Sequence, residues 1–227
     1  MSFGLSFTNN QDVVVLDSEF SRLCVIASGR YTPNDENGFG TYTTFPTVVT
    51  SQEPPLVFIR PDTVSGVMAA ATSMRLLGSA GNWTGFYIRT MSVNTAQPSG
   101  RYFVGAFGAQ AVASFGMRLW DGSTKLLFDS GTPSASFTRS FANWTYVKSE
   151  RTETTSYMNY YTVPFNFPEN EYLMINSFGM NLLSGDNVGR TISSLWDFSA
   201  GTLWAVTQSF NNPYDFHLPA VFAKITA

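Results

Sequence analysis

The sequence is poor in charge, cysteine and histidine. Only 13% of its 227 residues are charged, against about 25% in an ordinary soluble domain. With a net charge of −3, the chain lacks the basic footprint of a nucleic-acid binder. The single cysteine, Cys24, excludes a disulfide within the chain, and the single histidine, His217, excludes a histidine-rich metal site.

Long apolar runs are missing as well. No stretch approaches the ~18 uninterrupted apolar residues of a membrane-spanning helix, so we expect no membrane span. The first four residues, Met1 to Gly4, lack the basic and apolar segments of a secretory signal.

What the chain has in abundance is aromatic rings, at 15% of its residues, with 20 phenylalanines. A disordered chain would have few aromatic residues and a high net charge. Lysine and glutamate, the usual residues of helix surfaces, are scarce. The composition therefore favours a folded β protein made polar by hydroxyl and amide groups.

Short apolar or β-branched runs alternate with clusters of Gly, Pro, Asn and Asp. This spacing predicts an all-β fold of antiparallel β-sandwich-like modules. One segment, Val67 to Leu77, favours a helical turn or two through its closely spaced Ala and Met residues. Representative predicted strands are Leu23 to Ile26, Tyr42 to Thr50, Leu56 to Ile59, Tyr102 to Phe107 and Tyr172 to Ile175.

An internal repeat is the most informative feature. Phe3 to Asn10 recurs as Phe115 to Gly122, an offset of 112 residues, and Val14 to Ser18 is answered by Leu126 to Ser130. Each copy predicts a hairpin: an alternating strand, a turn containing Asn or Asp, and an apolar strand ending in Asp-Ser. Asp121-Gly122 is the stronger turn dipeptide of the two copies.

Weaker echoes follow at larger offsets. Leu56 to Phe58 resembles Leu173 to Ile175 at 117 residues, and Ser79 to Gly81 matches Ser199 to Gly201 at 120 residues. The growing offset is expected if the second copy gained loop residues. We therefore predict two tandem β-modules by internal duplication, residues 1–110 and 111–227. The alternative is one β-sandwich domain spanning residues 1–227 with two similar hairpins.

Residues suited to catalysis are few. His217 is the only imidazole, and its position near the C-terminus indicates a structural or surface role. Cys24 lies in an apolar run and is predicted to be a small buried hydrophobe. Neither a nucleophile elbow nor a phosphate-binding glycine loop occurs.

The acidic residues do not indicate a catalytic site either. Asp35-Glu36, Glu150 with Glu153, and Glu169 with Glu171 fall in polar or turn-like segments, which are typical of solvated loop acids. The run from Asn34 to Gly38 could bind calcium, but it lacks the spacing of an EF-hand loop and indicates a plain turn. We predict no enzyme activity, no cofactor, and no catalytic or metal-binding residues.

Two aromatic and amide-rich segments are candidates for an interface or a ligand site. Rings with neighbouring amides are common in glycan sites, while rings in strands more often fill a core or a protein interface. The candidate residues are Tyr157, Tyr160 and Tyr161 in the first segment, and Phe210, Asn211, Asn212 and Tyr214 in the second.

The duplicated Phe-Gly-Leu/Met to Asp-Ser hairpin resembles small tail-associated virion proteins of tailed bacteriophages, from the tail-tip or baseplate region. The likeness covers most of the chain and carries no catalytic motif. The residues that carry it are Phe3-Gly4-Leu5, Leu16-Asp17-Ser18, Asn82-Trp83-Thr84-Gly85-Phe86, Tyr102-Phe103-Val104-Gly105-Ala106-Phe107-Gly108, Phe115-Gly116-Met117-Arg118-Leu119 and Phe128-Asp129-Ser130-Gly131.

This resemblance implies a structural protein of the virion tail, made in the host cytoplasm and docked on other phage tail proteins. It also implies a homo-oligomer in the assembled particle. The alternative is a receptor-binding module that recognises a glycan or protein on the host cell surface. The sequence leaves open whether the chain is a scaffold or a receptor binder.

Overall fold

The computed structural model describes residues 6–8, 10, 14–17, 22–91, 95, 99–152, 156–178, 182–183, 189–209 and 216–226. These residues form eighteen β-strands and one short 3-10 helix, η1 (Glu36–Gly38). Every strand pairing in the described part is antiparallel. The predicted all-β, sandwich-like fold class is confirmed.

Six strands form a closed barrel. Their order around it is β11-β18-β14-β5-β8-β3, and β11 closes it on β3 through the pair Ser134 and Cys24. The strands are β3 (Leu23–Tyr31), β5 (Leu56–Pro61), β8 (Gly100–Phe107), β11 (Ser134–Phe141), β14 (Tyr172–Met174) and β18 (Ala220–Thr226).

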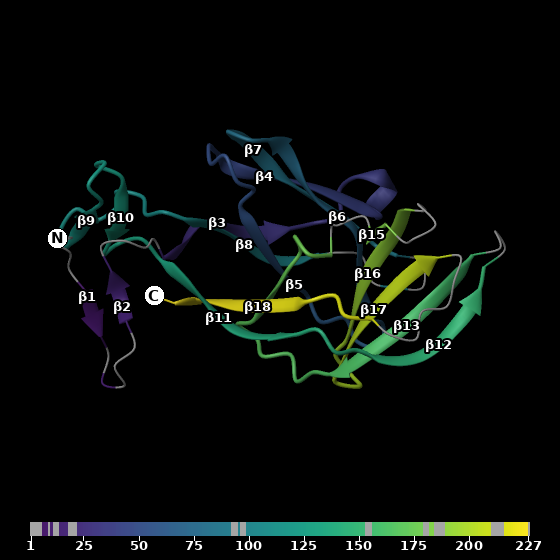
Figure 1. The fold of residues 1–227 in the computed structure, drawn as a ribbon. Coiled ribbons are helices and arrows are strands. Elements are labelled where there is room, and N and C mark those ends of the chain that lie inside the picture. The colour runs from purple at the N-terminus through teal and green to yellow at the C-terminus, as the bar shows by residue number, and fades with distance from the viewer. Residues whose placement is uncertain are drawn as a thin grey trace.

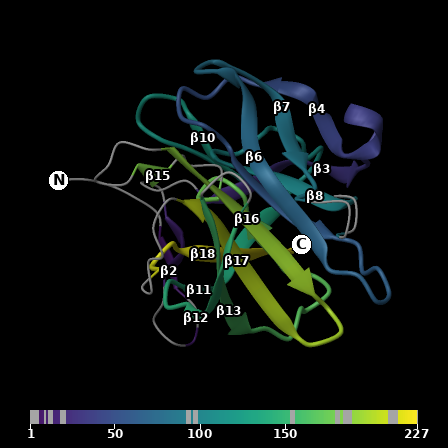
Figure 2. The same ribbon diagram turned by 90° about the vertical axis from the view of Figure 1, so that its right-hand side faces the viewer.

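A second, larger sheet packs against the barrel. Its order is β12-β13-β17-β16-β6-β7-β4, with β15 (Leu182–Leu183) paired to β16 at one side, and Figure 2 shows β16 and β6 side by side in it. The other strands are β4 (Gly40–Val49), β6 (Ala69–Ser79), β7 (Asn82–Arg89), β12 (Thr145–Arg151), β13 (Tyr157–Pro164), β16 (Gly189–Asp197) and β17 (Thr202–Ser209).

Strand alternation places two apolar cores on the two faces of the barrel wall. Val57 and Ile59 join the main core with Phe86 and Leu203 of the large sheet. Phe58, between them in sequence, faces the barrel interior and stacks on Phe103 at 4.5 Å between ring centroids. Much of the aromatic content of the sequence is thus buried inside the protein.

Two hairpins stand outside both sheets at one end of the molecule (Figure 1). One consists of β1 (Ser6–Thr8) and β2 (Val14–Asp17), and the other of β9 (Arg118–Trp120) and β10 (Leu126–Asp129). Both occur where the sequence repeat predicts hairpins. We refer to them as the first arm (β1–β2) and the second arm (β9–β10 together with residues 115–117, which precede β9).

The strand orders are symmetric about the middle of the chain. In the barrel, β3, β5 and β8 of the first half occupy places equivalent to β11, β14 and β18 of the second. In the sheet, β4, β6 and β7 correspond in the same way to β13, β16 and β17. The two halves therefore repeat one topology, and equivalent strands of the two halves pair at three places: β3 with β11, β5 with β14, and β6 with β16.

Local irregularities repeat as well. The ladder between β3 and β8 shifts register between Val25 and Ala27, and that between β11 and β18 shifts between Phe137 and Arg139. These bulges are 112 residues apart, the offset of the arms. Because bulges bend a strand at a defined place, the two halves curve at equivalent positions.

Each half contributes strands to both sheets, so neither half has a sheet to itself. The boundary between residues 110 and 111 falls between β8 and β9 and cuts no strand. The division into modules 1–110 and 111–227 stays a prediction.

The expected helical turn at Val67 to Leu77 is wrong, because Ala69–Ser79 is strand β6. Ala69, Ala70 and Ala71 are each 1% exposed and pair with Trp196, Leu195 and Ser194 of β16. Small side chains lie on both faces of this central strand, and a run of adjacent small residues resembles helical periodicity in the sequence.

Candidate functional site

The hairpin of the second arm has a five-residue loop, 121–125. The Asp121 carboxylate accepts hydrogen bonds from the backbone N–H groups of Ser123 at 2.8 Å and Lys125 at 2.9 Å. Thr124 adopts a positive φ of 67°. The predicted turn is present, but the aspartate side chain and Thr124 shape it rather than Gly122.

Asp129, the acid of the repeated Asp-Ser pair, holds the base of this arm together. Its buried carboxylate pairs with Arg118 at 2.6 Å and accepts hydrogen bonds from the backbone N–H groups of Ala113 and Gly131. Burial alone would raise the pKa of Asp129, but the hydrogen bonds from Arg118, Gly131 and Ala113 outweigh it and lower that pKa. The carboxylate is therefore charged at neutral pH and fixes the loop before β9.

Ser130 and Gly116 form the second contact at the base. The Ser130 hydroxyl accepts a hydrogen bond from the Met117 N–H at 3.1 Å. Gly116 has a φ of +138°, and a Cβ there would lie 1.9 Å from the Ser130 hydroxyl oxygen. Glycine is thus required at this close approach.

Phe115 is presented on this clamped loop and is 95% exposed. Trp120 and Met117 of the same arm are 54% and 37% exposed. A small open hollow of about 310 Å³ lies beside Phe115, lined by Ala113, Ser114, Gly116, Arg118 and Trp120. The arm therefore offers large apolar side chains to the solvent from a fixed backbone.

A larger open pocket, of about 500 Å³, lies at the mouth of the barrel. Phe107 and Phe137 line it and are 59% and 52% exposed. Leu23 and Ala135 line it as well, at the place where β3 pairs with β11. This end of the barrel thus also carries exposed apolar side chains.

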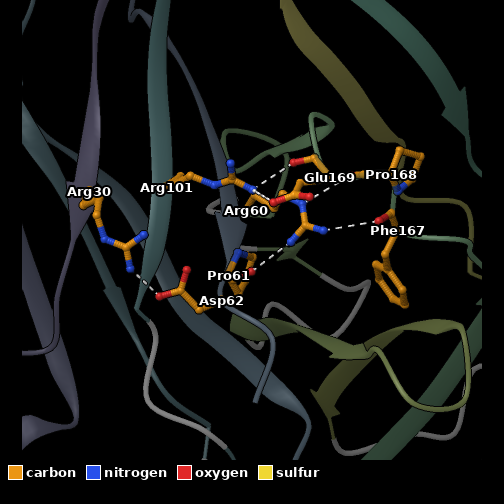
Figure 3. A network of polar contacts seen from close by, with 8 residues as sticks. All are labelled: Arg30, Arg60, Pro61, Asp62, Arg101, Phe167, Pro168 and Glu169. Atoms are coloured by element: carbon orange, nitrogen blue, oxygen red, sulfur yellow. Dashed lines mark hydrogen bonds and ion pairs between the residues drawn. The ribbon is translucent and has the colours of Figure 1, made fainter. Parts of the chain in front are cut away.

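Three arginines form a row across neighbouring barrel strands (Figure 3). Arg101 on β8 lies between Arg30 on β3 and Arg60 on β5 in register. Arg30 pairs with Asp62, and Arg101 donates to the backbone and carboxylate oxygens of Glu169. This row was not predicted, because its members are far apart in the sequence and follow no motif.

Arg60 ties the loop between β13 and β14 to the barrel. Its guanidinium donates to the carbonyl oxygens of Phe167 and Pro168, each at 3.2 Å, and Phe167 has a φ of +44°. Burial, and next the charge of Arg101, lower the pKa of Arg60. Arg60 therefore stabilises a backbone conformation that a phenylalanine rarely adopts.

Replacing Arg60 tests this assignment. Arg60→Lys keeps the charge but loses the planar, multiple hydrogen bonding, and we expect the free energy of unfolding to fall by about 1–2 kcal/mol in urea denaturation. Arg30→Lys at the exposed pair is the control, with an expected change under about 0.5 kcal/mol. Equal losses from the two variants would contradict the role of Arg60.

A second prediction concerns the base of the arm. Gly116→Ala places a methyl group against Ser130, and we expect amide exchange at Met117 and Ser130 to accelerate by about tenfold. Global stability should hardly change, because among the described strands β9 and β10 form a separate two-stranded sheet. Gly122→Ala, where a Cβ would meet nothing within 4 Å, is the matched control. Unchanged exchange in Gly116→Ala would show that the clamp is not needed.

The predicted ligand tyrosines do not form one cluster. Tyr161 is fully buried and stacks on Phe216 at 4.8 Å, and Tyr157 is half-buried on the same face of β13. Tyr160 lies on the opposite face, where burial and its hydrogen bond to Glu150 raise its pKa to about 12. Phe210, Asn211, Asn212 and Tyr214 lie outside the described residues.

The structure also places the residues that the sequence analysis considered for catalysis or calcium binding. Cys24 is buried, which raises its pKa, and His217 is exposed, as predicted. Glu36, in the run considered for calcium, pairs with Arg89 and accepts a hydrogen bond from Tyr87. Among the described residues, no three His, Cys, Asp or Glu side chains gather as a metal site would require. In the same part of the chain, no helix has the length and apolarity to cross a membrane.

The fold and the arm together define an all-β protein with a barrel, a packed sheet and an exposed aromatic hairpin. No family model matches the chain, and neither does any curated protein or solved structure.

Proposed function

We propose that the chain is a non-enzymatic structural component of a bacteriophage tail tip or baseplate, and that it docks on other virion proteins through the second arm. The sequence resemblance supports the location, and the exposed ring of Phe115 on a clamped loop supports the docking. A 95% exposed phenylalanine contributes nothing to the packing of its own chain. Its place on a fixed backbone suits a contact with another protein.

The energetics favour such a contact. Burial of a phenylalanine side chain in a partner pocket is worth about 1.5–3 kcal/mol. A loop already held by Asp129 and Ser130 loses little conformational entropy on binding, which keeps more of that gain. Trp120 beside it adds an aromatic side chain of the kind enriched at interface centres.

A receptor-binding module is the second candidate. Its support is the outer face of the large sheet, where Tyr160 and Trp204 lie half-buried beside Leu195 and Val206. Lys148 sits 4.9 Å from the centre of the Tyr160 ring. Binding on a glycan array that is lost in Trp204→Ala would favour this candidate over the structural one.

The composition of the particle tests the first proposal. In purified particles of the phage that encodes the chain, we expect mass spectrometry to detect it and antibody labelling to mark the tail tip. Absence of the chain from washed, intact particles would overturn the proposal.

A further inference from the structure

The exposed phenylalanines and tryptophans of the protein lie in two features. Among the described residues they are Phe107, Phe115, Trp120 and Phe137. Phe115 and Trp120 belong to the second arm, whereas Phe107 and Phe137 line the open pocket at the mouth of the barrel, which we call the barrel-mouth pocket. Gathered exposed rings of this kind mark a contact surface rather than scattered surface residues.

The second arm and the barrel-mouth pocket are neighbours. Arg22 lines the pocket, and its guanidinium carbon lies 5.5 Å from the centre of the Phe128 ring on β10. Ala109, two residues after Phe107, donates a backbone hydrogen bond to the carbonyl oxygen of Leu126 on β10 at 3.4 Å. The arm and the pocket therefore form one continuous surface, which has both a projecting ring and a hollow.

The chemistry of the pocket suits an aromatic side chain. Leu23, Phe107 and Phe137 line it, and the Phe137 ring lies 6.2 Å from that of Phe58 in the barrel interior, measured between centroids. An incoming ring would thus find aromatic partners already in place. Arg22 is the one charged residue among the lining side chains, and a guanidinium is attracted to the face of a ring. The volume of about 500 Å³ is in the range of pockets that take small ligands.

Phe115 does not fill the barrel-mouth pocket of its own chain, because it is 95% exposed. Its loop is fixed at the base of the arm by the hydrogen bonds of Asp129 and Ser130 and by the close approach at Gly116. The ring is therefore held in solvent, available to another molecule.

We propose that the virion protein that receives the second arm is a second copy of this chain, each copy inserting Phe115 into the barrel-mouth pocket of the other. A surface with both a ring and a hollow for a ring is self-complementary, as a contact between two identical chains requires. Each chain has one such ring and one such pocket, so the pair leaves neither unfilled. The inference rests on the proposed function and names the partner of the arm.

The charges at this surface favour the pair. Arg118, beside Phe115, is neutralised by its ion pair with Asp129, so Arg22 of the other copy meets no unpaired cation at the inserted ring. The side chains that line the pocket include no acid. Repulsion between like charges, which would oppose the contact of two identical surfaces, is thus absent where the ring enters.

Two variants of the full chain, compared by sedimentation equilibrium, test the pairing of ring and pocket. Phe115→Ala removes the ring, and Phe107→Asp places a charge in the pocket; each should weaken the pair by at least about 30-fold, because an aromatic contact at the centre of an interface is lost. Val147→Asp, at an exposed apolar residue on edge strand β12, is the control and should leave pairing unchanged. Urea denaturation checks that every variant is folded.

A mixture of the two variants sharpens this test. Phe115→Ala chains retain the pocket and Phe107→Asp chains retain the ring, so one of the two contacts can form and the mixture should pair better than either variant alone. A mixture that pairs no better, or a wild-type chain that stays monomeric at every concentration, would overturn the inference.

Photo-crosslinking locates the contact and separates this inference from the proposed function. A benzophenone-bearing analogue replaces Phe115 in isotope-labelled chains, which are mixed with unlabelled chains in solution and in assembling particles. We expect cross-links to Phe107 or to residues 134–137 of an unlabelled copy. Cross-links in the particle to a different virion protein alone would overturn the pairing and leave docking by the second arm intact. Chains that cross-link to one another in solution but enter no particle would overturn the proposed function and leave the pairing intact.

Discussion

Residues 1–110 and residues 111–227, produced as separate polypeptides, are each expected to remain unfolded. Three strand pairings join the halves: β3 with β11, β5 with β14, and β6 with β16. Separation leaves three open strands in each fragment and exposes the apolar faces on either side of them. Circular dichroism and urea titration of each fragment should show no cooperative transition.

Mixing the fragments supplies the control. Because each half carries the missing neighbours of the other, co-expression should restore a folded complex with a single cooperative transition. The main core draws Val57 and Phe86 from the first half and Leu173 and Leu203 from the second, which is the physical reason for this dependence. A cooperative transition in either fragment alone would contradict it.

Phe115→Ala is expected to lower incorporation of the chain into particles at least 30-fold, at unchanged stability. The loss follows from a contact worth about 2 kcal/mol or more, as for an aromatic residue at the centre of an interface. The free energy of unfolding should change by less than about 0.5 kcal/mol, because the ring is 95% exposed. Competition between wild-type and variant chains during assembly, read by mass spectrometry, measures the effect.

Tyr42→Ala is the matched control for this variant. Tyr42 is 48% exposed on edge strand β4, so its loss removes an exposed ring away from the arms. Its incorporation should stay near that of the wild type. Equal incorporation of Phe115→Ala and wild-type chains would contradict docking through the second arm.

The arms and the fold class could be predicted from local patterns. In each arm, alternating apolar residues, turn residues and the repeated Asp-Ser pair lie within a few residues of one another. Such local signals are enough to predict a hairpin from the sequence. The role of the pair could not be predicted, because it depends on the backbone of Ala113 and Gly116 folding back onto Asp129 and Ser130.

The sequence patterns could not predict which strands form the barrel and which form the large sheet. The similarity between Leu56 to Phe58 and Leu173 to Ile175 predicts an offset of 117 residues between equivalent positions, but Val57 and Leu173 face the same core and give an offset of 116. A shift of one residue reverses the faces of a strand. Weak similarity therefore located the equivalent strands without fixing their register.

For the same reason, the candidate site could be predicted only in part from the sequence. Tyr160 and Tyr161 are neighbours in sequence, which predicts one shared site, yet strand alternation points them to opposite faces of the large sheet. Phe115 belonged to the repeat that the sequence revealed, but aromatic residues of a core and of an interface look alike in a sequence. Only its exposure distinguishes it.

The surroundings of Phe115 in an assembled particle test the central claim most directly. A cryo-electron microscopy map of the tail at side-chain resolution should show the second arm against a neighbouring virion protein, with the ring of Phe115 buried in an apolar pocket of that protein. A map in which the chain is present and Phe115 remains in solvent would contradict the account.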